Sequence, residues 1–425
     1  LTTEQTIALT TTQVAALKTT QLAALTTAAL TSLTTDQIVA LTTAQAASLT
    51  AARAALLTTT QVAALETADV AALTVSAVAS LFTAQVTSLT TDQVAGLKTT
   101  QLAALTTAAL AALTTDQIVA LTTAQAASLT AARLALMTTA QIAAFETADI
   151  AALSSTAVAG MTTAQIAALT TDQVVGLKTA QAAALKSAQI AALTTDAFAA
   201  LETADLAAVS TTALAGVTTS QAAVLTTSQA VALTTAQAAV LTATQVGAMT
   251  TDVIAALETA DLAAMLIAAV GALTTDQASS LTTTQIAALK TTQLASLSTA
   301  SLASLTTDQI VALTTTQAAS LTATRAALLT TDQIAALETT DLAAMTTAAV
   351  AGLTTSQISS LTTDQTASLT TSQVLALSTA SVASLTTDQI ASLTTNQIAA
   401  LTTSQVESLT TDQFAALSTT QIAAF

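Results

Sequence analysis

The residues in this chain best suited to chemistry are five pairs of acidic side chains. In each pair a glutamate is followed three residues later by an aspartate, within a row such as LETADVAA. The pairs are Glu66/Asp69, Glu146/Asp149, Glu202/Asp205, Glu258/Asp261 and Glu338/Asp341. Residues three apart share a helix face, so each pair could offer two carboxylates to a calcium ion or to a reacting group.

The favoured interpretation of these pairs is nevertheless structural. A calcium ion takes roughly six to eight oxygen ligands, usually from a loop that contains glycine, and no such loop accompanies a pair. Nothing in the sequence sets one pair apart from the others, as a catalytic centre would require. We therefore expect a solvated helix face on which the aspartate closes a capping box, with calcium binding as the alternative.

The composition removes most other chemistry. The chain has no His, Cys, Trp, Tyr or Pro, which excludes imidazole catalysis, a thiol nucleophile, disulfides and the usual zinc and haem ligands. We therefore predict no enzyme activity, no catalytic or metal-binding residues and no cofactor. The net charge of −16 argues against nucleic acid as a partner. The longest apolar stretch, from Leu262 to Leu273, is too short for a transmembrane segment.

An eight-residue repeat determines which elements position these side chains. The chain consists of 53 rows of eight residues without insertion, followed by Phe425. Position one is always apolar and is Leu in 45 rows, and position five is Gln in 34 rows. Positions two and three are mostly Thr, position six is apolar except at Thr6 and Thr366, and positions seven and eight are mostly Ala. Since the spacing never slips, every row is expected to occupy an equivalent place in the fold.

Each row has the pattern of a short helix with its cap. In the row from Leu33 to Ala40, Thr34 is the N-cap, Gln37 completes a capping box, and Leu33 can pack on Ile38 as a hydrophobic staple. A strand would place positions one and six on opposite faces, and one long helix would let the apolar stripe drift by about 80° per row. The sequence therefore predicts an all-α fold with one short capped helix per row, and a β-solenoid is the alternative.

Helices of about six residues are unstable alone, so the rows must stack on one another. The sequence predicts a solenoid in which residues 1–425 form one continuous domain, itself a segment of a longer repeat array. All charges except Glu407 lie at position two, four or five, so these positions are expected to face water. The spacing of the acidic rows fits about 3.4 rows, or roughly 27 residues, per superhelical turn.

Two surface features are candidates for contact with something outside the chain. The threonines at positions two and three form a ladder similar to the flat faces of ice-binding proteins, although capping already explains position two. In the row that begins at Met265, Leu266 and Ile267 replace both threonines and would expose apolar groups. Leu266 and Ile267 are therefore candidates for a lateral contact, and the alternative is that this row is only better buried than the others.

The LTTxQIAAL-type rows resemble the long octapeptide-repeat regions of very large bacterial surface or secreted proteins, some of them adhesin-like. This resemblance covers all the rows. It implies a structural, non-enzymatic protein outside the cell or at the cell surface, which forms a rod or filament such as a surface fibre, matrix or adhesin stalk. The similar rows at both ends indicate self-association into fibres. The alternative is an ice-binding or calcium-binding repeat module.

Overall fold

The computed structural model describes residues 1–425 and is entirely helical. It contains 53 short α-helices, one per row, and no β-strand. The all-α solenoid predicted from the sequence is confirmed, and the alternative β-solenoid is excluded. None of the helices has both the length and the apolar character needed to cross a membrane.

Most helices begin as the repeat predicts. Thr34 is the N-cap of α5 (Thr35–Val39) and has an extended backbone, with φ −70° and ψ 163°. Its amide donates to Gln37 Oε1 at 2.9 Å, and the Gln37 amide donates to Thr34 Oγ1 at 3.3 Å. These two bonds satisfy amides that a helix start leaves without a backbone partner. The helices are four to six residues long and end before the next apolar position one.

The chain forms two compact units, Leu1–Gly216 and Val217–Phe425. The helices of the first unit are α1 (Thr3–Ile7), α2 (Thr11–Ala15), α3 (Thr19–Ala23), α4 (Thr27–Ser32), α5 (Thr35–Val39), α6 (Thr43–Ala47), α7 (Ala51–Ala54), α8 (Thr59–Ala64), α9 (Thr67–Ala72), α10 (Val75–Ala79), α11 (Thr83–Thr87), α12 (Thr91–Gly96), α13 (Thr99–Ala104), α14 (Thr107–Ala111), α15 (Thr115–Val119), α16 (Thr123–Ala127), α17 (Ala131–Leu134), α18 (Thr139–Ala144), α19 (Thr147–Ala152), α20 (Ser155–Ala159), α21 (Thr163–Ala167), α22 (Thr171–Val175), α23 (Thr179–Ala182), α24 (Ser187–Ala192), α25 (Thr195–Ala199), α26 (Thr203–Ala208) and α27 (Thr211–Leu214).

The second unit repeats the same construction. Its helices are α28 (Thr219–Ala222), α29 (Thr227–Ala232), α30 (Thr235–Ala238), α31 (Ala243–Ala248), α32 (Thr251–Ala256), α33 (Thr259–Ala264), α34 (Ile267–Gly271), α35 (Thr275–Ser280), α36 (Thr283–Ala288), α37 (Thr291–Leu294), α38 (Thr299–Ala303), α39 (Thr307–Val311), α40 (Thr315–Ala319), α41 (Ala323–Ala326), α42 (Thr331–Ala336), α43 (Thr339–Ala344), α44 (Thr347–Ala351), α45 (Thr355–Ser359), α46 (Thr363–Ser368), α47 (Thr371–Ala376), α48 (Thr379–Ala383), α49 (Thr387–Ser392), α50 (Thr395–Ala399), α51 (Thr403–Glu407), α52 (Thr411–Ala415) and α53 (Thr419–Ile422). That residues 1–425 are one continuous domain within a longer array stays a prediction.

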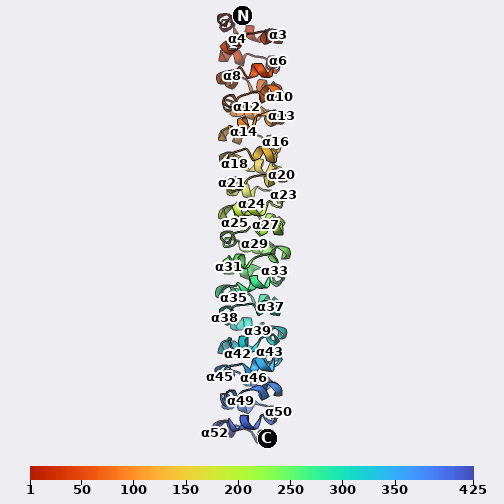
Figure 1. Ribbon diagram of the computed structural model, residues 1–425, viewed down its shortest axis with the longest axis vertical. Helices are drawn as coiled ribbons and strands as arrows, with labels where there is room; N and C mark the ends of the chain where they lie inside the picture. Colours follow the sequence, from red (N-terminus) through yellow and green to blue (C-terminus); the bar gives the residue numbers. More distant parts are fainter. The chain divides into compact units, whose positions relative to one another are not determined.

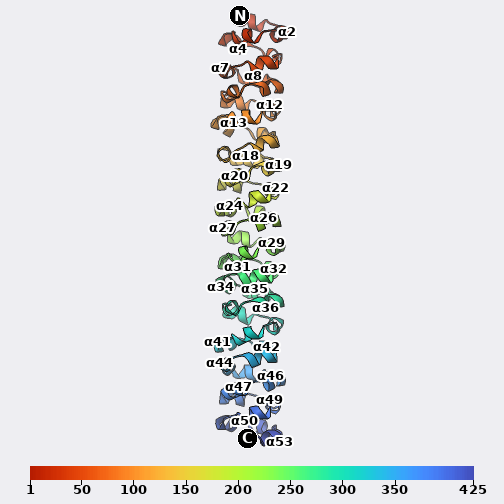
Figure 2. The same cartoon turned by 90° about the vertical axis from the view of Figure 1, so that its right-hand side faces the viewer.

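Within each unit the helices follow one another around an axis and stack along it (Figures 1 and 2). Within a unit most helices pack against helices three before or three after them, as α9 does against α6 and α12. The side chains at positions one and six are almost all buried and form the core of each unit, as Leu113 and Ile118 do. Burial of these apolar groups stabilises helices that are too short to persist alone.

Small residues at positions seven and eight let successive turns approach closely. At Gly216, at position eight of its row, a Cβ atom would collide with the carbonyl oxygen of Ser187 in the preceding turn. The frequent Ala, and the few Gly and Ser, at these positions therefore follow from the short distance between turns.

Candidate functional site

The side chain at position five, expected to face water, is buried and joins one turn to the next. Gln117 is 2% exposed. Its Oε1 accepts a hydrogen bond from the Thr114 amide at 3.0 Å, which caps its own helix. Its Nε2 donates to the carbonyl oxygens of Val86 at 2.9 Å and Leu89 at 2.8 Å, which belong to the preceding turn. One amide thus serves both the helix start and the stacking of turns.

This arrangement recurs through both units with the same register. Gln45, Gln173, Gln317 and Gln405 each donate to carbonyl oxygens 31 and 28 residues earlier. Such spacings place between three and four rows in a turn, in line with the expected 3.4 rows. The acceptors lie at the end of a helix, where carbonyl groups lack a partner within the helix. Position five is therefore buried because it satisfies groups that the previous turn leaves open.

The sequence contains one signal of this role. A capping box accepts Glu as readily as Gln, yet no row has Glu at position five, although the chain is rich in acidic residues. Glutamate can cap the helix but its carboxylate cannot donate to the preceding turn. The exclusive use of Gln reflects the need for a donor as well as an acceptor.

Arginine at position five makes the same bonds to the preceding turn. Arg53 donates from one guanidinium nitrogen to the Leu25 carbonyl at 2.9 Å and from the other to the Leu22 carbonyl at 3.0 Å. Arg133 and Arg325 repeat this geometry with carbonyls 28 and 31 residues earlier. Burial lowers the pKa of all three guanidinium groups. The expectation that these cations face water is wrong, because their donors are turned into the stack.

The acidic pairs are not solvated pairs on one face. In each pair the glutamate is the exposed N-cap, whereas the aspartate at position five is buried, with 1 to 2% of its surface exposed. No capping box forms in these rows, and the glutamate side chain accepts no capping hydrogen bond. The prediction that the aspartate closes a capping box on a wet face is therefore wrong. The cause is the stacking of turns, which covers position five.

The buried aspartates lack partners for part of their hydrogen-bonding capacity. The Oδ2 atoms of all five are buried without a hydrogen bond. Burial raises the pKa of Asp69, a hydrogen bond from the Thr43 hydroxyl lowers it, and the charge of Glu66 raises it. The pKa values of Asp149, Asp205 and Asp341 are raised by the same balance of causes, with Thr123, Thr179 and Thr315 as the hydroxyl partners.

The paired carboxylates are not arranged as a catalytic or metal centre. No group of three or more acidic side chains lies together in a way that could hold a metal ion. One carboxylate of each pair is in solvent and the other lies inside the stack, so the two do not present a common face. The sequence predicts a shared solvated face for each pair, whereas in the structure only the glutamate is exposed.

Leu266 and Ile267 lie where the sequence places them, at the start of α34. Their side chains are 52% and 50% exposed, and Leu266 is an N-cap without a side-chain hydrogen bond. The Ile267 carbonyl accepts a hydrogen bond from Ser296 Oγ at 3.1 Å, which ties its backbone to the next turn. The apolar side chains are therefore on the surface, and a lateral contact through them stays a prediction.

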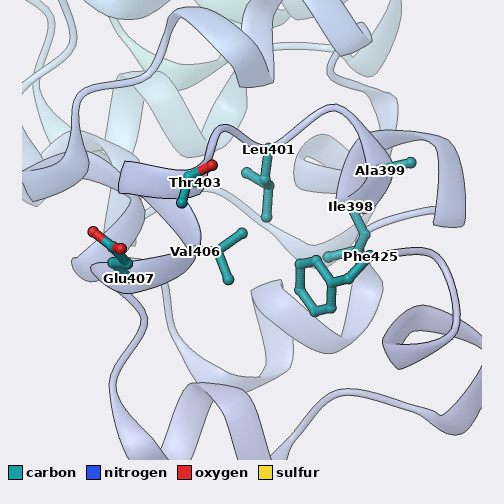
Figure 3. Close-up of a pocket in the computed structure, with 7 residues that line it drawn as sticks. All are labelled: Ile398, Ala399, Leu401, Thr403, Val406, Glu407 and Phe425. Carbon is teal, nitrogen blue, oxygen red and sulfur yellow. The ribbon is translucent and has the colours of Figure 1, made fainter.

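A pocket lies at the last turn of the second unit (Figure 3). Its lining residues are Ile398, Ala399, Leu401, Thr403, Val406, Glu407 and Phe425. Figure 3 shows Glu407 and the Phe425 ring on opposite sides of this pocket. Most of the lining consists of apolar side chains that continue the core of the solenoid. Glu407 is the single titratable side chain, so the pocket offers no acid and base pair.

Comparison with known protein families finds one match, to the family described as ALTTAQ repeat. The matched segments are residues 14–51, 62–99, 94–131, 142–179, 198–235, 254–291, 286–323, 334–371, 371–403 and 395–425. No curated protein and no solved structure matches the chain. The matched segments cover most of the sequence and coincide with the stacked rows of both units. The chain therefore belongs to the ALTTAQ repeat family.

Proposed function

We propose that this chain is a structural, non-enzymatic protein that provides length, as a rod or as part of a filament. The observation that carries the proposal is the position-five hydrogen bond. Rows with Gln or Arg at position five donate to the turn before them, and most rows offer carbonyl groups of the same kind to the turn after them. Further rows of the same sequence can be added because each uses the same contacts with its neighbours. The stability of such an array is approximately a sum over contacts between neighbouring rows.

The side-chain chemistry supports a non-enzymatic role. The chain has no imidazole and no thiol, and its most unusual carboxylates are buried in the stack. The polar side chains that could have formed a site instead cap helices or join turns. An enzyme would need at least one exposed, differentiated group, and the repeat supplies the same few side chains many times.

We further propose that the protein acts outside the cell or at the cell surface and associates with itself into fibres. The resemblance to repeat regions of large bacterial surface proteins supports the location. The net charge of −16 supports solubility at high local concentration. The exposed Leu266 and Ile267 supply an apolar point at which two rods could meet side by side.

Electron microscopy of the 425-residue chain tests the structural proposal. At low concentration we expect narrow, unbranched particles of constant width, and compact particles would contradict it. At higher concentration we expect longer or laterally paired particles, and particles that never exceed the size of one chain would contradict self-association. The double variant Leu266→Thr/Ile267→Thr, which restores the common row, should lose lateral pairing and keep the particle width. Cell fractionation with an antibody against the chain tests the location.

A further inference from the structure

Apart from Ser381, whose hydroxyl bonds Ser378 Oγ at 2.8 Å in its own row, polar side chains at position five follow one chemical rule with a single exception. Gln donates from its amide, Arg from its guanidinium, and Ser301 from its hydroxyl to the Leu273 carbonyl at 2.8 Å. All three place a donor against carbonyl oxygens of the preceding turn. Rows with Ala or Val place no polar atom there at all. The exception is aspartate, which as a carboxylate can only accept.

In the aspartate rows, the carbonyl oxygens that a donor at position five would reach have no side-chain partner. The carbonyls 31 and 28 residues before Asp69 are those of Ile38 and Leu41, the positions that a glutamine at 69 would reach. Neither receives a hydrogen bond from any side chain, and the Oδ2 atom of Asp69 is buried without a partner. The same holds for the other four aspartates and the carbonyls 31 and 28 residues before each. A buried carboxylate with one oxygen left without a hydrogen bond is costly if it is ionised.

The surroundings of these aspartates are the same in all five rows. Position three of the row three earlier is always threonine, at Thr43, Thr123, Thr179, Thr235 and Thr315. Position six of that earlier row is always alanine, at Ala46, Ala126, Ala182, Ala238 and Ala318, which is a minority residue at position six elsewhere. Each aspartate row therefore stacks on a row of the same type, with Thr at position three and Ala at position six. Both rows together determine the surroundings of the buried aspartate.

We propose that Asp69, Asp149, Asp205 and Asp341 are held in the stack as neutral carboxylic acids that donate to carbonyls of the preceding turn. A carboxylic acid supplies the donor that glutamine, arginine and serine supply in other rows. The consequence is that four places along the solenoid stack more firmly in acid than at neutral or alkaline pH.

The pKa shifts agree in sign with this arrangement. For Asp69, Asp149, Asp205 and Asp341, burial raises the pKa above the value of the unfolded chain. The neutral aspartates contribute fully to the stability of the folded chain below about pH 4, which is near their pKa in the unfolded chain. This stabilisation is lost as the pH rises through their raised pKa in the folded chain.

Few other charges face these aspartates. On its own helix, each has the exposed glutamate N-cap three residues before it, and the charge of that glutamate raises the pKa of the four shifted aspartates. The helices packed against them carry only exposed charges, at Asp92, Asp172 and Asp364. Lys178, the N-cap of the helix beneath Asp205, is also exposed. None of these provides a buried cation that would keep the aspartate ionised.

The test compares the intact chain with a variant in which all five aspartates are replaced by asparagine, for example Asp69→Asn. Asparagine has the same shape and donates at every pH. In buffer with a metal chelator, the melting temperature of the intact chain should fall more steeply than that of the variant between about pH 4 and pH 8. The infrared band of a protonated carboxyl group should persist at neutral pH in the intact chain and be absent from the variant.

A matched control removes the same number of negative charges from the surface. Asparagine replaces the exposed position-four residues Asp36, Asp116, Asp276, Asp308 and Asp388, which lie on helices that do not pack against the buried aspartates. The steeper pH dependence and the infrared band of the intact chain should both remain. Parallel pH profiles for the intact chain and the buried-site variant, without the infrared band, would overturn the proposal. So would a stability at neutral pH that rises with added calcium or sodium in the intact chain alone, because the carboxylates would then be ionised and bridged by a cation.

Discussion

Replacement of Gln117 by alanine measures directly what the position-five side chain contributes. The change removes one bond to the Thr114 amide and two bonds to the carbonyls of Val86 and Leu89, at 2.8 to 3.0 Å. A typical hydrogen bond contributes about 1 kcal/mol, so the loss should be about 3 kcal/mol. The Leu89 residue is 4% exposed, so its carbonyl group is not readily rehydrated and the estimate should not be much smaller.

Hydrogen exchange measured by mass spectrometry is the suitable assay, because a repeat array opens locally before it unfolds as a whole. Amides between residues 86 and 121 should exchange about 100-fold faster in Gln117→Ala, since about 1.4 kcal/mol corresponds to a factor of ten. Peptides from the second unit, such as residues 331–344, should be unchanged.

Two further variants separate the loss of the Gln117 donor from the loss of its capping acceptor and from a general effect of substitution. Gln117→Glu keeps the capping acceptor and loses the donor, so it should also open faster at neutral pH and recover in acid. Thr115→Ala, at an exposed neighbouring position, should change exchange by less than about threefold. Equal protection in Gln117→Ala and Thr115→Ala would refute the role assigned to position five.

Three other substitutions test the packing of turns. Ile118→Ala, at a fully buried position six, should cost about 3 kcal/mol in a denaturant titration, whereas a loss below about 1 kcal/mol would contradict its place in the core. Gly216→Ala should destabilise the chain by about 1 to 3 kcal/mol because its Cβ would meet the Ser187 carbonyl, while Gly247→Ala, whose Cβ would lie 3.5 Å from its nearest neighbour, should stabilise it by about 0.5 to 1 kcal/mol. Melting curves in which the two glycine variants shift in the same direction would count against the close approach of turns. Arg53→Gln should keep the melting temperature within a few degrees, because glutamine reaches the same carbonyls, whereas Arg53→Leu should lower it measurably.

The features of this fold that depend on residues within one row could be predicted from the sequence. The helix starts, the caps and the buried positions one and six depend on residues within one row, so a single row such as Leu33 to Ala40 contains the information. The capping role of Gln37 was predicted correctly for the same reason. The row spacing also indicated stacking, because isolated helices of this length are not stable.

The position-five contacts could not be predicted in the same way. The partners of Gln117 lie 28 and 31 residues earlier, and no pattern within a row connects them. Polar side chains such as Arg53 and Asp69 therefore predicted a solvent-exposed surface. In the structure the neighbouring turn covers them in part or fully. The absence of Glu at position five was the available signal, because it distinguishes a donor from a side chain that only caps.

The stacking register, in which each helix packs on the helix three rows away, is tested most directly by a disulfide. The chain has no cysteine, so a pair introduced as Gly271→Cys/Ser296→Cys can react only with itself. A Cβ atom at residue 271 would lie 3.4 Å from the Ser296 Cβ, close to the separation of about 3.8 Å in a disulfide. The control pair Gly271→Cys/Ser304→Cys is displaced by one row, and Ser304 contacts Thr275 instead. We predict that the 271/296 pair oxidises fully within one chain while the 271/304 pair stays reduced. Oxidation of the control pair, or of neither pair, would contradict the register.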